Sequence, residues 1–165
     1  MTDATPTQSA NEGAITFRRA QFIDLDLLLK FMQALQLDDP WSVPFNPVLA
    51  RNTLRQLLED STLGRVWVIS DGAEAIGYIV MSFDFSLEYG GRNAWIDEIF
   101  VQRSRRGKKI GTQALEFFAE QARVLGVTAI HLEVNRGNPA LELYRRMGYR
   151  DHERYLMTQL LAPKP

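Results

Sequence analysis

Hydrophobic and polar residues alternate with two different periods along the first part of the chain. Residues 15–19 alternate as in a half-buried strand, and over residues 22–37 apolar side chains recur at the three-to-four spacing of an amphipathic helix. The stretch 38–47 holds three prolines and is expected to form a loop, after which helical spacing returns over residues 48–58. The chain is thus predicted to open with a strand and two helices that flank a rigid aromatic loop.

From residue 65 the pattern changes to short runs rich in Val, Ile, Tyr and Trp. Residues 65–70 and 75–83 are separated by the turn-forming pair Asp71-Gly72, which predicts an antiparallel hairpin. Residues 93–101 follow a second glycine turn and predict another strand. We expect this strand to be the central member of the sheet.

A helix and a further strand follow. Helical periodicity runs over residues 110–125 and stops at Gly126, and residues 128–134 have the composition of a strand. A strand, a helix and a strand of these lengths favour a parallel crossover. The sheet is therefore expected to be mixed.

The last part of the chain predicts one more helix and the end of the sheet. Asn138 suits the N-cap of this helix, Pro139 suits its first position, and Gly148 is expected to end it. Residues 149–160 can supply two last strands. The predicted fold class is therefore α/β (α+β), with a mixed, mostly antiparallel, twisted sheet of six to seven strands and about four helices.

Composition indicates a globular protein with one domain. The chain has 165 residues, of which 45% are hydrophobic and 24% charged. We expect residues 1–13 to be a disordered tail and residues 14–165 to form a single domain. No apolar run reaches the roughly 18 residues of a membrane span and the polar start does not resemble a signal peptide, so we expect a cytoplasmic protein without a membrane partner.

Cysteine and histidine are too scarce to support several kinds of chemistry. The absence of cysteine excludes disulfides, thiol catalysis and thiolate metal sites. The two histidines, His131 and His152, are isolated from each other and do not predict a zinc site. We therefore expect no metal.

Positive charge is concentrated at one point, although the formal net charge of the chain is only −1. Five of the seven residues from Arg103 to Lys109 are cationic, and they lie between a predicted strand that ends at Val101 and a predicted helix. Helix N-terminal amides bind anions, and Gly107 and Gly111 would allow phosphate to approach the backbone closely. The segment is thus predicted to bind phosphate.

Other interpretations of this basic segment are open on charge alone. The charges alone do not distinguish a phosphate loop from a solvated face or a nucleic-acid patch. The spacing matches neither a nucleotide P-loop nor a dinucleotide-binding fingerprint. The position between a strand and a helix favours the phosphate loop, and the overall charge argues against nucleic acid as a partner.

Two segments resemble motifs of the GCN5-related N-acetyltransferase (GNAT) family. The residues Val101-Gln-Arg-Ser-Arg-Arg-Gly-Lys-Lys-Ile-Gly111 resemble its acetyl-CoA signature, and Asn138-Pro-Ala-Leu-Glu-Leu-Tyr-Arg-Arg-Met-Gly-Tyr-Arg150 resembles its second motif, with slightly shifted spacing. Both occur in the family's order and separation. The resemblance implies the GNAT acyl-CoA N-acyltransferase fold and an enzyme that transfers an acetyl group from acetyl-CoA, as co-substrate, to a primary amine.

The resemblance also implies which residues bind the cofactor. The main chain of Phe100 and Val101 would pair with the pantetheine arm like an added strand, and Asn138 would contact the cofactor from the opposite side. The implied cofactor-binding residues are Phe100, Val101, Arg106, Gly107, Lys108, Lys109, Ile110, Gly111, Thr112 and Asn138. Lys109 stands where the family usually has a glycine, so it must either adopt a conformation open to ordinary residues or point away from the pyrophosphate.

Direct transfer to an amine needs a proton acceptor and a proton donor. Tyr144 occupies the position at which family members usually place the tyrosine that protonates the leaving thiolate. Glu98 and Glu133 are equally weighted candidates for the base. Since neighbours in a strand face opposite ways, only one of Asp97 and Glu98 is expected to face the cleft.

The acceptor is not identified by the sequence. A small molecule, a protein N-terminus or a lysine are all compatible, and so is a homodimer. Acidic side chains that could attract a cationic amine are Asp38, Asp39, Asp84 and Glu88, and aromatic side chains that could pack against an apolar body are Trp41, Phe45, Phe83 and Phe85. The alternative functions are a noncatalytic acyl-CoA sensor, suggested by Lys109, and a nucleic-acid-binding module.

Overall fold

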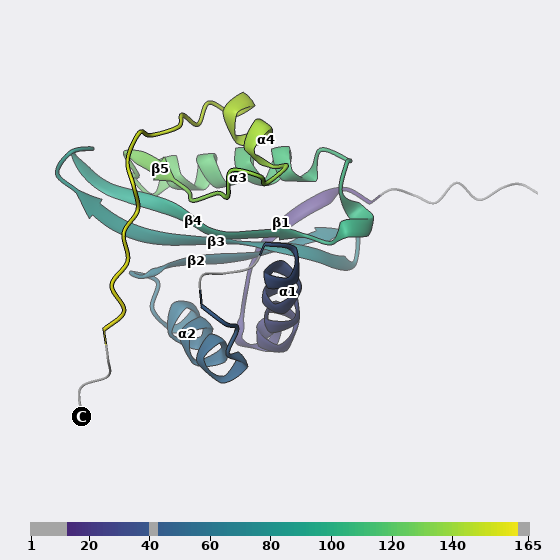
Figure 1. The fold of residues 1–165 in the computed structure, drawn as a ribbon. Coiled ribbons are helices and arrows are strands. Elements are labelled where there is room, and N and C mark those ends of the chain that lie inside the picture. Colours follow the sequence, from purple (N-terminus) through teal and green to yellow (C-terminus); the bar gives the residue numbers. More distant parts are fainter. Residues whose placement is uncertain (1–12, 40–42, 162–165) are drawn as a thin grey trace, which may run out of the picture.

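A central five-stranded sheet lies between two layers of helices (Figure 1). The computed structural model describes residues 13–39 and 43–161. The strands, in their order across the sheet, are β1 (Ile15–Arg19), β2 (Gly64–Asp71), β3 (Glu74–Ser86), β4 (Gly91–Val101) and β5 (Ala129–His131). The helices are α1 (Leu25–Asp38), α2 (Pro47–Glu59), α3 (Ile110–Val124) and α4 (Leu141–Arg146), with 3₁₀ turns η1 (Phe22–Asp24) and η2 (Arg103–Arg105).

The order of the strands follows the chain. β1 to β4 form an antiparallel meander, and Gly72, with a φ of 59°, makes the tight turn between β2 and β3. β5 pairs in parallel with β4 after the crossover through α3. The predicted hairpin and the predicted parallel crossover are therefore confirmed, as is the mixed α/β fold class.

The predicted number of strands is wrong, because the described residues form five strands and not six to seven. Residues 149–161 contain no strand, and large apolar side chains there, such as Tyr155 and Met157, are exposed. A strand needs a partner as well as suitable residues, and this segment pairs with none of the described strands. β5 is also shorter than the predicted strand 128–134, and the middle strand is β3 rather than β4.

The start of α4 also differs from the prediction. The helix begins at Leu141, and Asn138 precedes it in a turn in which its Oδ1 accepts a 2.8 Å hydrogen bond from the amide of Ala140. Asn138 therefore caps this turn and not the helix itself. Gly148 ends the helix with a φ of 91°, as predicted. The predicted disordered tail lies almost wholly outside the described residues.

Apolar side chains fill both sides of the sheet. Ile79, Ile96 and Phe118 belong to the core under α3 and α4, which we call the upper core. Phe31 and Tyr78 belong to the core against α1 and α2, which we call the lower core. β4 contributes to both cores, which fixes its position. In the described ranges, no helix is both long and apolar enough to cross a membrane.

Candidate active site

β4 and β5 separate after a short pairing, which opens a slot at the edge of the sheet. The two strands pair only from Asn93 with Ala129 to Trp95 with His131. β4 then continues to Val101, and none of the described strands pairs with this outer edge of it. The free main chain of a strand can pair with an extended ligand, so the edge of β4 is a candidate binding surface.

A β-bulge interrupts β4 beside this slot. Glu98 pairs with Val80 of β3 and Ile96 pairs with Met81, so Asp97 is an extra residue without a partner on β3. Ile96 and Ile99 both lie in the upper core although they are three positions apart, which shows that the alternation slips at this point. The regular alternation on which the expectation about Asp97 and Glu98 relied is therefore broken at this point, and which of the two faces the cleft stays a prediction.

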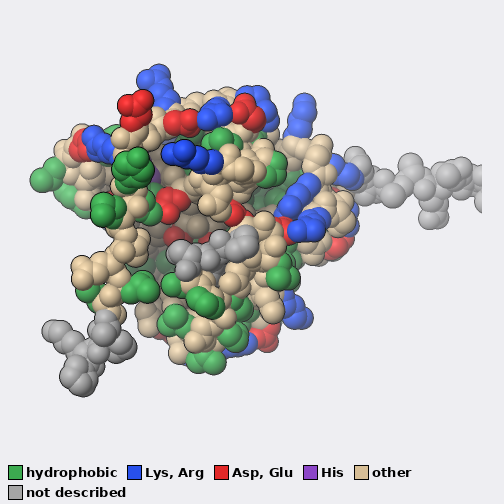
Figure 2. Space-filling view, viewed as in Figure 1, with side chains coloured by type: hydrophobic (Ala, Val, Ile, Leu, Met, Phe, Trp, Pro, Cys, Tyr) green, Lys and Arg blue, Asp and Glu red, His purple; other side chains and the backbone are tan. Residues whose placement is uncertain are grey.

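The carboxylate of Glu98 lies toward the side of α1 and α2. Glu98 accepts a 2.6 Å hydrogen bond from the hydroxyl of Tyr78, whose ring is buried in the lower core. Burial is the main cause that raises the pKa of Glu98, and the charge of Asp97 adds to it, as expected of a close neighbour. Figure 2 shows acidic side chains in a hollow of the surface between the two helical layers.

The pKa of Glu98 suits a general base that works near neutral pH. Burial raises its pKa to about 7, against the opposing effect of the hydrogen bond from Tyr78. Desolvation also raises the pKa of Asp97, although that side chain reaches the surface. Glu133, the other candidate base, is exposed beyond the end of β5 in the loop that leads to α4. The environments of the two candidate bases are thus clearly different.

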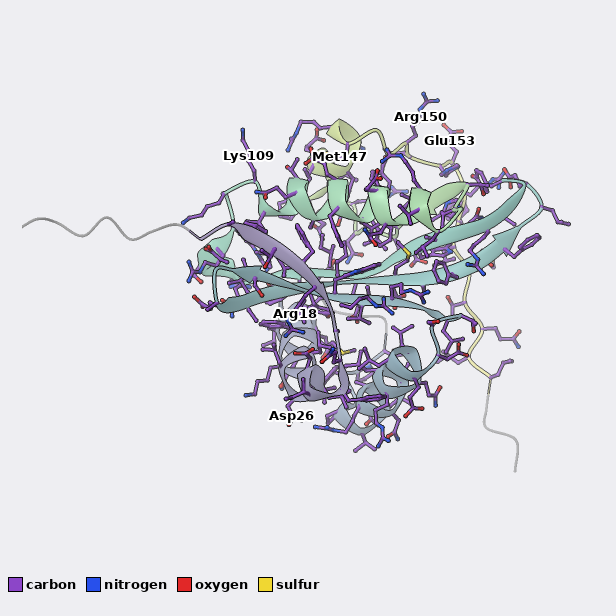
Figure 3. The ribbon with its side chains drawn as sticks, turned by 180° about the vertical axis from the view of Figure 1, so that it is seen from behind. Arg18, Asp26, Lys109, Met147, Arg150 and Glu153 are labelled. Atoms are coloured by element: carbon purple, nitrogen blue, oxygen red, sulfur yellow. The ribbon has the colours of Figure 1, made fainter. Side chains whose placement is uncertain are left out.

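The basic segment connects β4 to α3, and its backbone is shaped by two left-handed residues. Gly107 has a φ of 82°, and Lys109, the N-cap of α3, has a φ of 61° and a ψ of 15°. Lys109 is the single non-glycine residue with positive φ in the described ranges. Its side chain projects away from the sheet (Figure 3). Lys109 therefore adopts a backbone conformation that favours glycine, and its side chain points outward.

Several predicted cofactor residues can offer only their main chain. Phe100 is buried in the lower core, and Val101 and Ile110 are buried in the upper core. Gly111 lies against α4, where an added Cβ would come within 3.1 Å of Leu143 Cδ2. The first-turn amides of α3, including that of the half-buried Thr112, have no partner inside the helix and can bind an anion. Lys108 is exposed beside them.

Arg106 is folded back onto the protein. Its Nε donates a 2.8 Å hydrogen bond to the carbonyl of Val101, its Nη2 forms an ion pair with Asp38, and its guanidinium carbon lies 5.7 Å from the centre of the Phe100 ring. Asp38 also accepts a 2.7 Å hydrogen bond from Nε of Arg103. The acidic residue expected to attract an amine thus lies against the basic segment.

Asp39, the neighbour of Asp38, contacts the loop between β5 and α4 on the other side of the slot. Its Oδ2 accepts a 2.9 Å hydrogen bond from Nδ2 of Asn138, and its Oδ1 accepts one from the side chain of Asn135. Tyr144 is buried on α4, and burial and the charge of Asp39 raise its pKa. Its hydroxyl therefore remains protonated at neutral pH and can donate a proton. The structure brings Asp39 close to Asn138 and Tyr144, and the place of Asp39 beside these two predicted site residues was not predicted from the sequence.

Three rings that were not predicted gather near the paired part of β4 and β5. Trp95 and His131 are partners on the two strands, and Tyr89 lies in the turn before β4. The ring of His131 lies 4.8 Å from that of Tyr89 and 5.1 Å from that of Trp95, measured between ring centres. Desolvation lowers the pKa of His131, and Asp84 and Glu88 counter this effect. These rings form an aromatic wall beside the bulge.

The aromatic residues that the sequence proposed for an acceptor are less well placed. The guanidinium carbon of Arg92 lies 4.8 Å from the centre of the Phe83 ring, which packs against the upper core, and Phe85 is exposed. Phe45 is half-buried, and Trp41 lies outside the described residues. In the part of the chain that the structure describes, no group of three His, Asp or Glu side chains could hold a metal ion.

Comparison with known proteins gives a consistent result. A family model described as "Acetyltransferase (GNAT) family" matches residues 29–149. Thialysine N-epsilon-acetyltransferase of Mus musculus is 34% identical over 83 residues, which cover 50% of this chain and 48% of that protein. The chain thus spans about half the length of the curated relatives it matches.

Two solved structures resemble the whole domain. The integron cassette protein HFX_CASS3, from the mobile metagenome of Cole Harbour Salt Marsh, is 33% identical with a TM-score of 0.77, and the match covers 90% of this chain and 91% of that one. A protein from Clostridium acetobutylicum, described as a predicted acetyltransferase with acetyl-CoA, is 17% identical with a TM-score of 0.76, and the match covers 88% and 96% of the two chains. The second likeness concerns the fold alone.

Proposed function

The chain belongs to the acetyltransferase (GNAT) family, and from this premise we propose that it is an N-acetyltransferase that uses acetyl-CoA to acetylate a primary amine. The observation that carries the proposal is the continuity of the slot. The free edge of β4 runs to Val101 and leads, through the basic segment, to the open amides at the start of α3. An extended arm that ends in a pyrophosphate matches this arrangement.

The cofactor would be held mainly by the backbone. The main chain of Phe100 and Val101 would pair with the amides of the pantetheine arm, and residues 107 to 112 would present amides to the phosphates. Asn138 lies across the slot, where it would contact the arm from the other side. The left-handed conformation of Lys109 supports this proposal, because it keeps the backbone shape that a glycine would give.

We assign the role of base to Glu98 in preference to Glu133. An ammonium with an ordinary pKa near 10 must lose a proton before it can attack, and a half-buried carboxylate with a pKa of about 7 can take that proton at neutral pH. The hydrogen bond from Tyr78 holds one oxygen of the carboxylate, which leaves the other free. The proton can pass directly or through a water molecule.

Tyr144 is the proposed acid. Acetyl-CoA supplies an activated acyl carbon, to which the amine nitrogen bonds as the carbon–sulfur bond breaks. The leaving sulfur needs a proton, and the protonated hydroxyl of Tyr144 is suited to donate it. As the amide forms, the nitrogen loses a second proton, which restores the hydroxyl of Tyr144 directly or through water. The proton taken by Glu98 passes to solvent, so the products are one amide, one free thiol and one released proton.

The acceptor is proposed to be a primary amine of a small molecule, a protein N-terminus or a lysine. The acidic hollow and the aromatic wall of Tyr89, Trp95 and His131 favour an amine that approaches as a cation, since carboxylates and ring faces both attract cations. The mouse relative is named for thialysine, a basic amino acid, so thialysine and lysine belong in the first set of acceptors to be tested.

The test has two parts. Calorimetry with acetyl-CoA measures binding, and release of free thiol in the presence of amines measures turnover. We expect acetyl-CoA to bind and at least one amine, among basic amino acids, polyamines and peptides with free N-termini, to give thiol release. Failure to bind any acyl-CoA would contradict the proposal, and binding without turnover of any amine would favour the noncatalytic sensor.

A further inference from the structure

We propose that Asp38 and Asp39, at the end of α1, form an acidic clasp that occupies Arg106 and Asn138 until acetyl-CoA displaces it. The inference rests on the proposed function, because it concerns the same slot. Its basis is the set of contacts that these two neighbouring carboxylates make. Each carboxylate holds one of the two walls of the slot.

Asp38 holds the wall formed by the basic segment. Its two oxygens bind Arg103 and Arg106, with Arg103 Nη2 at 2.5 Å from Oδ1 and Arg106 paired with Oδ2. The Asp38 side chain is only 14% exposed, whereas those of Arg103 and Arg106 are 74% and 45% exposed. The carboxylate therefore lies inward and draws both guanidinium groups toward α1.

Asp39 holds the opposite wall. Its two oxygens accept hydrogen bonds from the side chains of Asn135 and Asn138, in the loop that leads from β5 to α4. Asn138 is thereby fixed between Asp39 and the amide of Ala140. One end of a single helix thus connects both sides of the slot.

The partners of the clasp are groups that an incoming cofactor needs. A carboxylate and a phosphate bind a guanidinium with the same geometry, so Asp38 is an internal substitute for a phosphate at Arg106. A phosphate at the start of α3 would lie close to Asp38, and two anions near one guanidinium repel each other. Of the two N–H donors on Nδ2 of Asn138, one is taken by Asp39, so this donor becomes available to the cofactor only when Asp39 moves away. Cofactor binding and the clasp therefore compete.

Opening of the clasp would also release α1 from both walls. The contacts of Asp38 and Asp39 join the end of α1 to segments more than sixty residues away in the sequence. When acetyl-CoA takes over Arg106 and Asn138, these contacts are lost together. The clasp would thus couple occupation of the cofactor slot to the freedom of the end of α1.

The test is the affinity for coenzyme A, measured by calorimetry on the full chain at low salt. Asp38→Asn keeps the size of the side chain and removes its charge, which ends its ion pairs with Arg103 and Arg106. We therefore expect the dissociation constant to fall about two- to fivefold, the range for loss of an exposed ion pair. Asp39→Asn should act in the same direction. In the Arg106→Gln background the effect of Asp38→Asn should disappear, because the contested group is gone.

Two variants control for the change of charge. Asp26→Asn removes a carboxylate that pairs with Arg51 near the other end of α1, and Asp71→Asn removes one that pairs with Arg105 of the basic segment. Both should change the dissociation constant by less than about twofold, since neither faces the slot. If Asp71→Asn tightened binding as much as Asp38→Asn, the effect would be one of general charge and the clasp would be refuted.

The outcomes separate the clasp from the proposed function. If the wild type does not bind coenzyme A, the proposed function fails and the clasp fails with it. If the wild type binds and Asp38→Asn leaves the affinity unchanged or weakens it, the clasp alone is overturned, because Asp38 would then support Arg106 and not compete for it. Thermal unfolding of each free variant shows that it is folded.

Discussion

The hydroxyl of Tyr78 donates a 2.6 Å hydrogen bond to Oε2 of Glu98, and so joins the interior of the lower core to the bulged edge of β4. Tyr78 is 1% exposed, so its position is set by the packing around it. The bond fixes the orientation of a carboxylate that burial makes a stronger base. A residue of the core therefore positions the proposed base.

Replacement of Glu98, the proposed base, should abolish the pH dependence of kcat/KM that its ionisation causes. Glu98→Gln keeps the size of the side chain but cannot accept a proton, so we expect kcat to fall about a hundredfold or more. In the wild type, kcat/KM should rise with pH through a midpoint of about 7 as Glu98 ionises, and this limb should be missing in the variant. If Glu133→Gln removes the limb and Glu98→Gln does not, the base is Glu133.

Glu98 should also make stability depend on pH. Its pKa in the folded protein, about 7, is raised above that of the unfolded chain, so the folded state holds the proton more tightly. The corresponding stability is fully present below about pH 4 and is lost as the pH rises through 7. The free energy of unfolding of the wild type, relative to that of Glu98→Gln, should therefore fall by about 3 kcal/mol between pH 4 and pH 8.

Urea denaturation of both proteins across this pH range checks the difference. Glu116→Gln, which removes an exposed carboxylate from α3, controls for the loss of one acidic group. A wild-type curve parallel to that of Glu98→Gln would show that the carboxyl is not desolvated in the folded protein.

The backbone at Lys109 predicts that a glycine is preferred there. A left-handed conformation costs a residue with a Cβ about 1 kcal/mol, so Lys109→Gly should raise the free energy of unfolding by up to about 1 kcal/mol. Lys108→Gly removes the same charge from a neighbour that does not have a positive φ, and it should lower stability. Chemical denaturation of the two variants measures the contrast, and equal effects would contradict the left-handed conformation.

Removal of the Tyr144 hydroxyl distinguishes an acetyltransferase from a noncatalytic acyl-CoA sensor. Tyr144→Phe keeps the buried ring on α4, so acetyl-CoA binding and stability should change little, while kcat should fall about tenfold to a hundredfold through loss of the proton donor. Tyr149→Phe is the matched control, because Tyr149 packs edge-on against Tyr144 with 5.9 Å between ring centres. Thiol release that is equally fast in Tyr144→Phe and wild type would exclude the acid role.

The sequence by itself determined the features that depend on neighbouring residues. The change of hydrophobic period located the helices and most of the strands, because side-chain direction repeats with the local backbone. The glycine-containing basic segment between β4 and α3 and the turn at Gly148 were legible for the same reason. The resemblance to the family rested on two such short segments.

Only the tertiary structure decided the contacts between distant segments. The slip at Asp97 arises from the register with β3, and the pKa of Glu98 arises from burial and from Tyr78, which is twenty residues away. The ion pair of Asp38 with Arg106 joins residues 68 positions apart. The segment 149–161 had the residues of a strand, but a strand also requires an edge to pair with. Local periodicity contains no information about such partners, since they are set by how the layers pack.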